Sequence, residues 1–230
     1  MWQVQAELPG VPRPLMLYHY AETVRDFCTR TKAWNYNSPA ALDLAADTAW
    51  PTISAGTEIP ALTYVVEPTS VKWSDGRKIQ FLTRDQLDKY DGDWEQATAT
   101  IPSAWTVTGP KAWTVYPLLS ANVTAKLYMR FAIAPSRTEA AMRTGMPEEL
   151  TYEFQDLWAY GTMSRLMKIP GKDWSNVQQA AAYSQIYELG IRTAKSRAAA
   201  DFGRPDRTVA YGGISIGGNS DVRNTDDYGR

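Results

Sequence analysis

One segment near the C-terminus has the spacing of a catalytic motif. Gly213-Ile214-Ser215-Ile216-Gly217 fits G-x-S-x-G, the pattern that places a hydrolase serine on a sharp turn between a strand and a helix. Such a serine needs a base, usually a histidine that follows it in the chain. The single histidine, His19, comes earlier, and Gly217-Gly218-Asn219 is a poor helix start. We therefore expect no catalysis at Ser215. The segment is interpreted as a flexible glycine-flanked stretch or as a strand that lacks a partner.

The other candidates for catalysis or metal binding have structural interpretations too. Cys28 is the only cysteine, so it predicts a small buried side chain and neither a disulfide nor a thiolate metal site. His19 is interpreted as a packed or solvated residue. The acidic run DKYDGDWE at residues 88–95 fails the calcium-loop register, because Leu87 stands where the first aspartate belongs. We expect no catalytic residue, no metal, no cofactor and no enzymatic activity.

Composition bounds the class of protein. The 230 residues are 44% hydrophobic, and 24 basic residues balance 25 acidic ones for a net charge of -1. A surface that coats nucleic acid or lipid needs a basic excess, which is absent. The chain has no run of about 18 apolar residues and its first ten residues do not form a signal peptide. These features predict a protein that folds in a reducing cytoplasm, with no membrane partner.

The elements that position these residues begin with a helix. No clear period is seen before residue 14, and Pro14 suits a first helical turn. The NYNSP segment at residues 35–39 is expected to end this helix. Its apolar positions repeat at helical spacing and are Met16, Tyr20, Val24, Phe27, Cys28 and Thr31.

A β-rich block follows from about residue 40 to residue 135. Short strand-like runs alternate with glycine and proline turns: TYVVE, SVKW, KIQFL, WTVT, AWTVYPL and VTAKLYMRFAI. Asp75-Gly76 predicts a hairpin, and Thr83 is expected to cap a short helix that ends at Tyr90. The spacing of the strands is typical of a β-sandwich or small barrel.

Two helices are expected after this block. Met146-Pro147-Glu148-Glu149 predicts a helix start, with the two carboxylates at the positive end of the helix dipole. Leu150, Phe154, Leu157 and Trp158 form its apolar face, and residues 167–171 end it. Asp173 or Ser175 is expected to cap the last helix. The apolar face of that helix is Val177, Ala180, Ser184, Tyr187, Ile191, Ala194 and Ala198.

The predicted fold class is α+β, a helical frame with an inserted antiparallel β-sandwich or barrel-like block. The frame takes residues 14–36 and 136–203, the inserted block residues 37–135, and residues 204–230 form an extended C-terminal arm. The arm is rich in glycine and poor in large apolar residues, a composition that cannot build its own core.

Within this order, a set of short motifs is similar to one family. Phe27-Cys28 with Trp34 opens the set, followed by Tyr64, Asp75-Gly76, Leu87, Trp94 and Val115-Tyr116-Pro117, then Arg130 to Ser136 (RFAIAPS), Met146 to Leu150 (MPEEL), Gly161, Leu166 and Ile169 to Asn176 (IPGKDWSN). Over roughly residues 14–203 the chain resembles the head-to-tail adaptor proteins of tailed bacteriophages, which are related to tail tubular protein A of short-tailed phages.

The resemblance implies a structural role in the virion. Such adaptors form a ring of twelve copies under the portal protein, extend the DNA channel, and give the tail nozzle or tail tube a docking surface. DNA would pass through the lumen without sequence-specific binding, and the near-zero net charge suits such a channel, because a basic lining would hold phosphates.

The arm is the candidate binding site in this interpretation. Its apolar anchors are Val209, Tyr211, Ile214 and Ile216, with Arg207, Arg223 and Arg230 as charged partners. We expect these residues to dock on the portal by adding an extended strand to a sheet edge.

Two alternatives remain open. The nine tryptophans would suit a carbohydrate-binding or glycan-processing tail module, if several lay on one face of one sheet. They are spread over positions 2, 34, 50, 73, 94, 105, 113, 158 and 174. A tail terminator or stopper is the alternative among structural proteins, although these tend to lack a helical frame.

Overall fold

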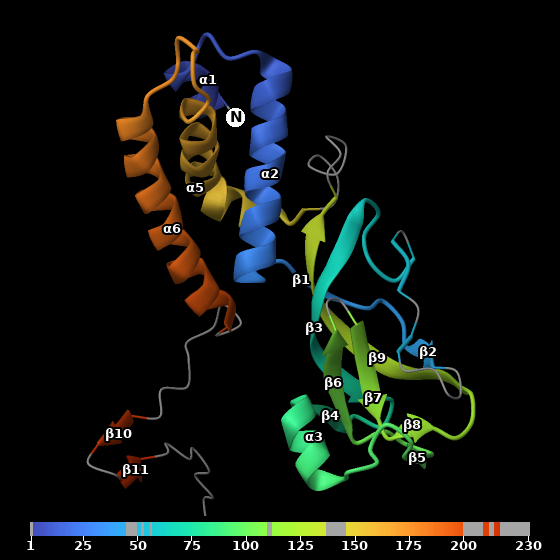
Figure 1. Cartoon of the computed structure of the whole chain (residues 1–230). Helices are drawn as coiled ribbons and strands as arrows, with labels where there is room; N and C mark the ends of the chain where they lie inside the picture. Colours follow the sequence, from blue (N-terminus) through green and yellow to red (C-terminus); the bar gives the residue numbers. More distant parts are fainter. Residues whose placement is uncertain are drawn as a thin grey trace, which may run out of the picture.

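The computed structural model has a helical bundle at one end and a β-rich block at the other (Figure 1). It describes residues 2–44, 50–51, 53–55, 57–109, 112–136, 146–199, 209–211 and 214–216. The chain passes from the bundle into the block, returns to the bundle, and then continues into the C-terminal arm. This is the α+β class that the sequence predicts.

The described part of the bundle contains α1 (Trp2–Glu7), α2 (Arg13–Thr31), α5 (Glu148–Met167) and α6 (Val177–Ala199). The start of α2 and the start of α5 agree with the proline signals in the sequence. The sequence analysis missed α1, a single short segment whose Val4 and Leu8 pack with Met163 and Leu166 of α5. A helix of this length shows no full hydrophobic period, so its stability comes from that packing.

Two helix ends differ from expectation. α2 ends at Thr31, because Lys32 adopts the left-handed conformation (φ 56°) and donates its backbone N–H to Cys28 O at 2.9 Å. The cap of α6 is Asn176, not Asp173 or Ser175: its Oδ1 accepts the Gln179 N–H at 3.0 Å. Val177, expected on the apolar face of α6, is 70% exposed.

Small residues let the three long helices approach closely. Gly161 of α5 lies where a Cβ would come within 2.6 Å of Thr23 Cγ2 and 2.8 Å of the Tyr187 ring. Tyr187 is held there, since its hydroxyl donates to Thr23 O or Asp26 Oδ2, both at 3.1 Å. Arg30 also joins α2 to α6 through two hydrogen bonds to Glu188 of 2.7 and 2.5 Å.

The block is organised around one long strand. β9 (Val123–Pro135) pairs antiparallel with β1 (Asn35–Asn37), β2 (Leu42–Leu44) and β3 (Thr63–Trp73). The segment that the sequence analysis gave to a helix end is therefore strand β1. TYVVE and SVKW, which look like two runs, belong to the single strand β3.

β3 continues through the predicted hairpin into the rest of the sheet. Gly76 takes φ +89° in the turn, and Val71 pairs with Ile79 of β4 (Lys78–Phe81). The main sheet has the order β1-β9-β3-β4-β6-β7, with β2 also on β9. The remaining elements of the block are α3 (Arg84–Tyr90), β5 (Thr98–Ala99), β6 (Ala104–Gly109), β7 (Ala112–Tyr116) and β8 (Leu118–Leu119). Thr83 caps α3 as predicted, in a capping box with Gln86.

The main hydrophobic cluster runs from the bundle into the sheet. Phe27 of α2 packs on Phe154 and Trp158 of α5, with ring centroids 4.7 and 5.6 Å apart. The same cluster of buried residues includes Trp34 and Phe131 of the block. The division of the chain into a frame and an inserted domain remains a proposal, and packing is continuous across its boundary.

The described part of the arm is a hairpin, not one extended strand. β10 (Val209–Tyr211) pairs antiparallel with β11 (Ile214–Ile216), and Val209 lies opposite Ile216. The two residues between the strands are Gly212 and Gly213, a dipeptide typical of tight hairpins.

Candidate functional site

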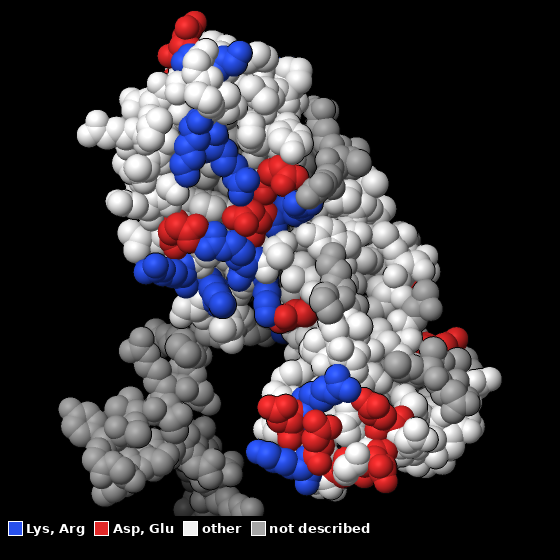
Figure 2. Space-filling model, viewed as in Figure 1, with Lys and Arg blue, Asp and Glu red and all other residues white. Residues whose placement is uncertain are grey.

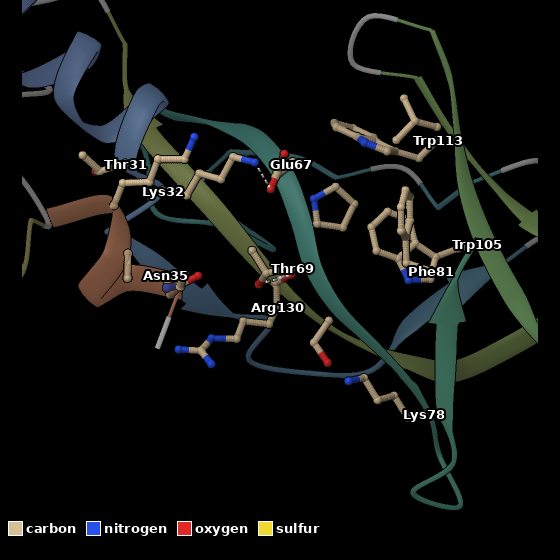
Figure 3. Close-up of a pocket in the computed structure, with 16 residues that line it drawn as sticks. Thr31, Lys32, Asn35, Glu67, Thr69, Lys78, Phe81, Trp105, Trp113 and Arg130 are labelled. Atoms are coloured by element: carbon tan, nitrogen blue, oxygen red, sulfur yellow. Dashed lines mark hydrogen bonds and ion pairs between the residues drawn. The ribbon is translucent and has the colours of Figure 1, made fainter. Parts of the chain in front are cut away.

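A cleft of about 780 Å³ lies where the bundle meets the block (Figure 3). The ends of two helices reach it. Thr31 is the last residue of α2 and Lys32 follows it, and Ala198 and Ala199 are the last residues of α6. Strand residues complete the lining from β1, β3, β4, β6, β7 and β9. α6 ends at Ala199, which is one of the residues that line this cleft.

The path of β4 opens the cleft. β4 first pairs antiparallel with the end of β3, at Val71 and Lys72. It then pairs in parallel with β6, at Gln80 and Phe81. The sheet therefore turns away from β3 at this point, and residues 67–70 of β3 face β6 and β7 across the cleft.

Aromatic side chains form one wall. Phe81 and Trp105 lie 4.8 Å apart between ring centroids, and Trp50 lies 6.0 Å from Trp105 and 5.9 Å from Trp113. Phe81, Trp105 and Trp113 stand together on one side of the cavity in Figure 3. Trp50, Trp105 and Trp113 lie close together in the folded protein. The expectation that the tryptophans are scattered is wrong for these three.

The sequence analysis missed this wall, although a signal for it exists. The tetrapeptide AWTV occurs at residues 104–107 and again at residues 112–115. The β6–β7 hairpin sets the two copies antiparallel, so Trp105 lies opposite Val115 and Val107 lies opposite Trp113. Directly opposite residues share a face of the sheet, which places both tryptophans on the same face.

Several polar groups in the cleft are engaged with their neighbours, although the buried Asn35 Oδ1 has no hydrogen-bond partner among the described residues. Lys32 and Glu67 form an ion pair, drawn as a dashed line in Figure 3. The Thr31 hydroxyl donates to Phe27 O at 2.8 Å, and the Thr69 hydroxyl donates to Arg130 O at 3.2 Å. The lining contains one carboxylate, Glu67, and no histidine or cysteine. The cleft therefore offers apolar surface and positive charge for binding, without an arranged nucleophile and base.

The acidic run near Gly92 has a structural role. Trp94 Nε1 donates to Asp88 Oδ1 at 2.6 Å, and the Tyr116 hydroxyl donates to Asp91 Oδ2 at 2.9 Å. These bonds hold α3 and its loop over a small core that contains Leu87 and Trp94. Within the described ranges, no group of three or more His, Cys, Asp or Glu residues could hold a metal ion.

His19 and Cys28 lie in α2 with no catalytic arrangement around them. Burial, together with the nearby charge of Arg165, lowers the pKa of His19. Burial raises the pKa of the Cys28 thiol to about 12, so this fully buried side chain stays protonated and unreactive at neutral pH.

The structure places part of the predicted arm site. In the register of the hairpin, Val209 pairs with Ile216, Ala210 with Ser215 and Tyr211 with Ile214. Arg207, Arg223 and Arg230 lie outside the described residues.

Replacing the serine of the G-x-S-x-G segment tests whether it has a catalytic role. We expect Ser215→Ala to leave virion assembly and infectivity within about twofold of the parent, since Ser215 lies in β11 and the single histidine, His19, comes before it in the chain. Plaque counts and particle yields from a complemented phage measure this. A hydrolase activity that disappears with Ser215→Ala would contradict the interpretation.

Comparison with known proteins gives a match to one family model over most of the chain. A family model described as SU10 adaptor protein matches residues 3–209. No curated protein matches the chain. Among the described helices, none is long and apolar enough to cross a membrane.

Proposed function

The chain belongs to the SU10 adaptor protein family, the phage head–tail adaptors, and from this premise we propose that it is a ring-forming subunit of the head–tail junction. In this proposal about twelve copies sit between the portal protein and the tail nozzle or tail tube. The ring extends the channel through which DNA is ejected, and the subunits are made in the host cytoplasm and end in the virion.

The extent of the family match carries the proposal. It spans residues 3–209, a range that contains the described helices and strands of the bundle and the block apart from Trp2 of α1, and the first residue of the arm hairpin. The adaptor assignment therefore concerns the entire body of the protein and not one module within it.

The continuous core supports a role in which the subunit must resist deformation. Buried residues of α2, α5 and α6 belong to the same cluster as those of β3 and β9. A junction between head and tail must keep its geometry while DNA passes, and a continuously packed body transmits force with little deformation.

The arm supports attachment to a partner. A two-stranded hairpin is at best marginally stable alone in water, and the register of β10–β11 pairs Val209 with Ile216 and Tyr211 with Ile214. We propose that Val209, Tyr211, Ile214 and Ile216 dock on the portal, with Arg207, Arg223 and Arg230 at the edge of the contact.

The aromatic wall favours one alternative, binding of a glycan by the cleft. Trp105 is 7% exposed, however, whereas Phe81 is 49% exposed and Trp113 is partly buried, so Phe81 is the most accessible of the three rings. Retention of the protein on immobilised host glycans, lost in Phe81→Ala, would favour this alternative over the adaptor role.

Assembly on the portal is the test of the proposed function. We expect the purified protein to be monomeric or weakly associated, and to form rings when portal particles are added. An arm that orders on docking loses conformational entropy, so free subunits gain less from one another than portal-bound subunits do.

Light scattering of the protein alone, and electron microscopy of the mixture with portal particles, measure the two states. A stable closed ring without portal would contradict assembly on the portal. Absence of any complex with the portal would contradict the adaptor role itself.

A further inference from the structure

The cleft between the bundle and the block has an excess of basic side chains. The described residues that line it include Lys32, Lys78, Arg130 and Lys195 but one carboxylate, Glu67, and that carboxylate is already paired with Lys32. Lys78 and Lys195 form no ion pair with the described residues. The whole chain has 24 basic and 25 acidic residues, so the concentration of positive charge is a local property of the cleft.

The positive charge continues from the cleft onto the neighbouring strand. Lys78 lies directly opposite Lys72 in the register of β3 and β4, and both side chains are exposed. Like charges directly opposite each other destabilise a sheet, and no described carboxylate forms an ion pair with either lysine. An anion bound beside the two lysines would relieve their repulsion, so the register itself favours an anionic partner.

The acidic side chains of the block gather at the end that lies away from the bundle. Residues 84–95 contain five carboxylates and two basic side chains, and Figure 2 shows acidic residues over α3 at the lower end of the molecule. The block therefore carries charge of opposite sign at α3 and at the cleft. An acidic partner is repelled from the first surface and attracted to the second.

Apolar surface lies beside the cations of the cleft. Phe81 is 49% exposed and Val107 is 43% exposed, and both line the cavity. In Figure 3 the aromatic wall occupies the upper part of the cavity, whereas Lys78 and Arg130 lie in the lower part. A neutral glycan would make no use of the cations, and a run of phosphates would make no use of Val107. The two parts together suit a partner that has both carboxylates and apolar side chains.

Two strand edges are open on either side of the cleft. β3 pairs with β9 along its whole length, whereas β4 pairs with two residues of β3 and two residues of β6. Within the described ranges, no strand pairs with the β4 side of residues 67–70 or of residues 106–109. Pro68 and the irregular register of β3 lie in this stretch, and such features keep an open edge from pairing indiscriminately. Side chains, and not the backbone alone, would therefore select a segment that lies between these edges.

We propose that the cleft binds an acidic segment of a partner protein, in extended conformation, that also carries a large apolar side chain. Its carboxylates would lie toward Lys78, Arg130 and Lys195, and its apolar side chain against Phe81 and Val107. Alternate side chains of an extended segment point to opposite sides, so alternating acidic and apolar residues suit the two parts of the cavity. The inference goes beyond the adaptor role and requires neither a ring nor the arm.

Binding of a labelled peptide to the full-length protein tests the proposal. The probe is Asp-Phe-Glu-Val-Asp-Val-Glu with blocked ends, and fluorescence anisotropy measures its binding. We expect saturable binding that weakens as salt is added, because salt screens the attraction between charges. An uncharged version, Asn-Phe-Gln-Val-Asn-Val-Gln, and a version with serine in place of phenylalanine should each bind at least about tenfold more weakly.

Charge reversal in the cleft tests which surface binds the probe. Lys78→Glu with Lys195→Glu should weaken binding about tenfold or more. The sheet should tolerate this change, since Lys78→Glu places opposite charges across from each other at Lys72. The matched control is Lys168→Glu with Lys172→Glu, which changes the net charge equally at two exposed positions outside the cleft. It should leave binding within about twofold, and circular dichroism checks that each variant folds.

Phe81→Ala tests the apolar contact. On this variant the probe and its serine version should bind alike within about twofold, because the same contact has been removed from the protein side. On the parent protein the two peptides should differ about tenfold. An equal difference on both proteins would show that the phenylalanine of the probe binds elsewhere, which would contradict the proposed arrangement.

The remaining outcomes identify other occupants. Absence of saturable binding, or an equal loss in the two double variants, would overturn the proposal. A ten-residue oligothymidylate that binds as tightly as the probe, and equally to Phe81→Ala, would assign the cleft to nucleic acid instead. A dimer in light scattering that disappears in Lys78→Glu with Lys195→Glu would assign it to a second copy. All of these measurements use the protein without portal particles, so their result is separate from the test of the adaptor role.

Discussion

A chain that ends at Pro205 is expected to keep its circular dichroism spectrum and melting transition but to lose co-sedimentation with portal particles. The body retains its whole core, because every residue of the main hydrophobic cluster precedes Ala199. The truncation removes both strands of the arm hairpin. Main-chain hydrogen bonds contribute roughly 0.5–1.5 kcal/mol each, and their repetition in a ring makes the loss large. We expect apparent affinity to fall about a hundredfold or more.

A shorter truncation, which removes only the residues after Gly218, locates the contact within the arm. A chain that ends at Gly218 keeps β10 and β11 but lacks Arg223 and Arg230. If the hairpin is the anchor, this chain should bind portals nearly as well as the full protein. Unchanged loading by the chain that ends at Pro205 would instead move the portal contact to the bundle or the block.

Gly161→Ala is expected to lower the free energy of unfolding by about 1–2 kcal/mol, and the melting temperature by roughly 2–8 °C for a chain of this size. The new methyl group would lie 2.6 Å from Thr23 Cγ2 and 2.8 Å from the Tyr187 ring. Neither neighbour can yield easily, because both are buried and hydrogen-bonded. The overpacking cost of about 1–3 kcal/mol exceeds the helix-propensity gain of roughly 1 kcal/mol. Thermal and denaturant unfolding measure the change.

Gly190→Ala is the matched control for this effect. Its methyl group would come within 2.3 Å of Leu157 Cδ1, but that atom is the end of a flexible, partly buried side chain that can rotate away. The propensity gain is the same, so stability should be nearly unchanged. Equal destabilisation at both positions would show that close packing around Gly161 is not the cause.

Local signals predicted much of the fold. Pro14 in the first turn of α2, the glycine turn between β3 and β4, and the capping threonine of α3 each act within a few residues, and the structure confirms them. The errors fall where tertiary contacts decide. Residues 35–37 become a strand because β9 lies beside them, and α1 is helical where it packs on α5.

The candidate surfaces were harder to predict than the elements. The cleft exists because β4 changes partner along its length: Ile79 pairs with Val71 of β3, whereas Gln80 pairs with Ala104 of β6. No pattern within β4 indicates such a change. The aromatic wall had a readable signal in the repeated AWTV, but its meaning depends on the β6–β7 register.

The long-range packing of the bundle has a consequence for the order in which the protein forms during synthesis. The Tyr187–Thr23 bond joins residues 164 positions apart, and the Arg30–Glu188 pair spans 158. At about 5–20 residues per second, roughly 8–30 seconds pass between the synthesis of α2 and the synthesis of α6, the helix that covers it. α2 is thus made early but is among the last helices to be buried, and its apolar face is exposed to chaperones and to other nascent chains throughout that interval. The arm is synthesised after α6, so the body has all of its parts before the segment proposed to bind the portal is complete.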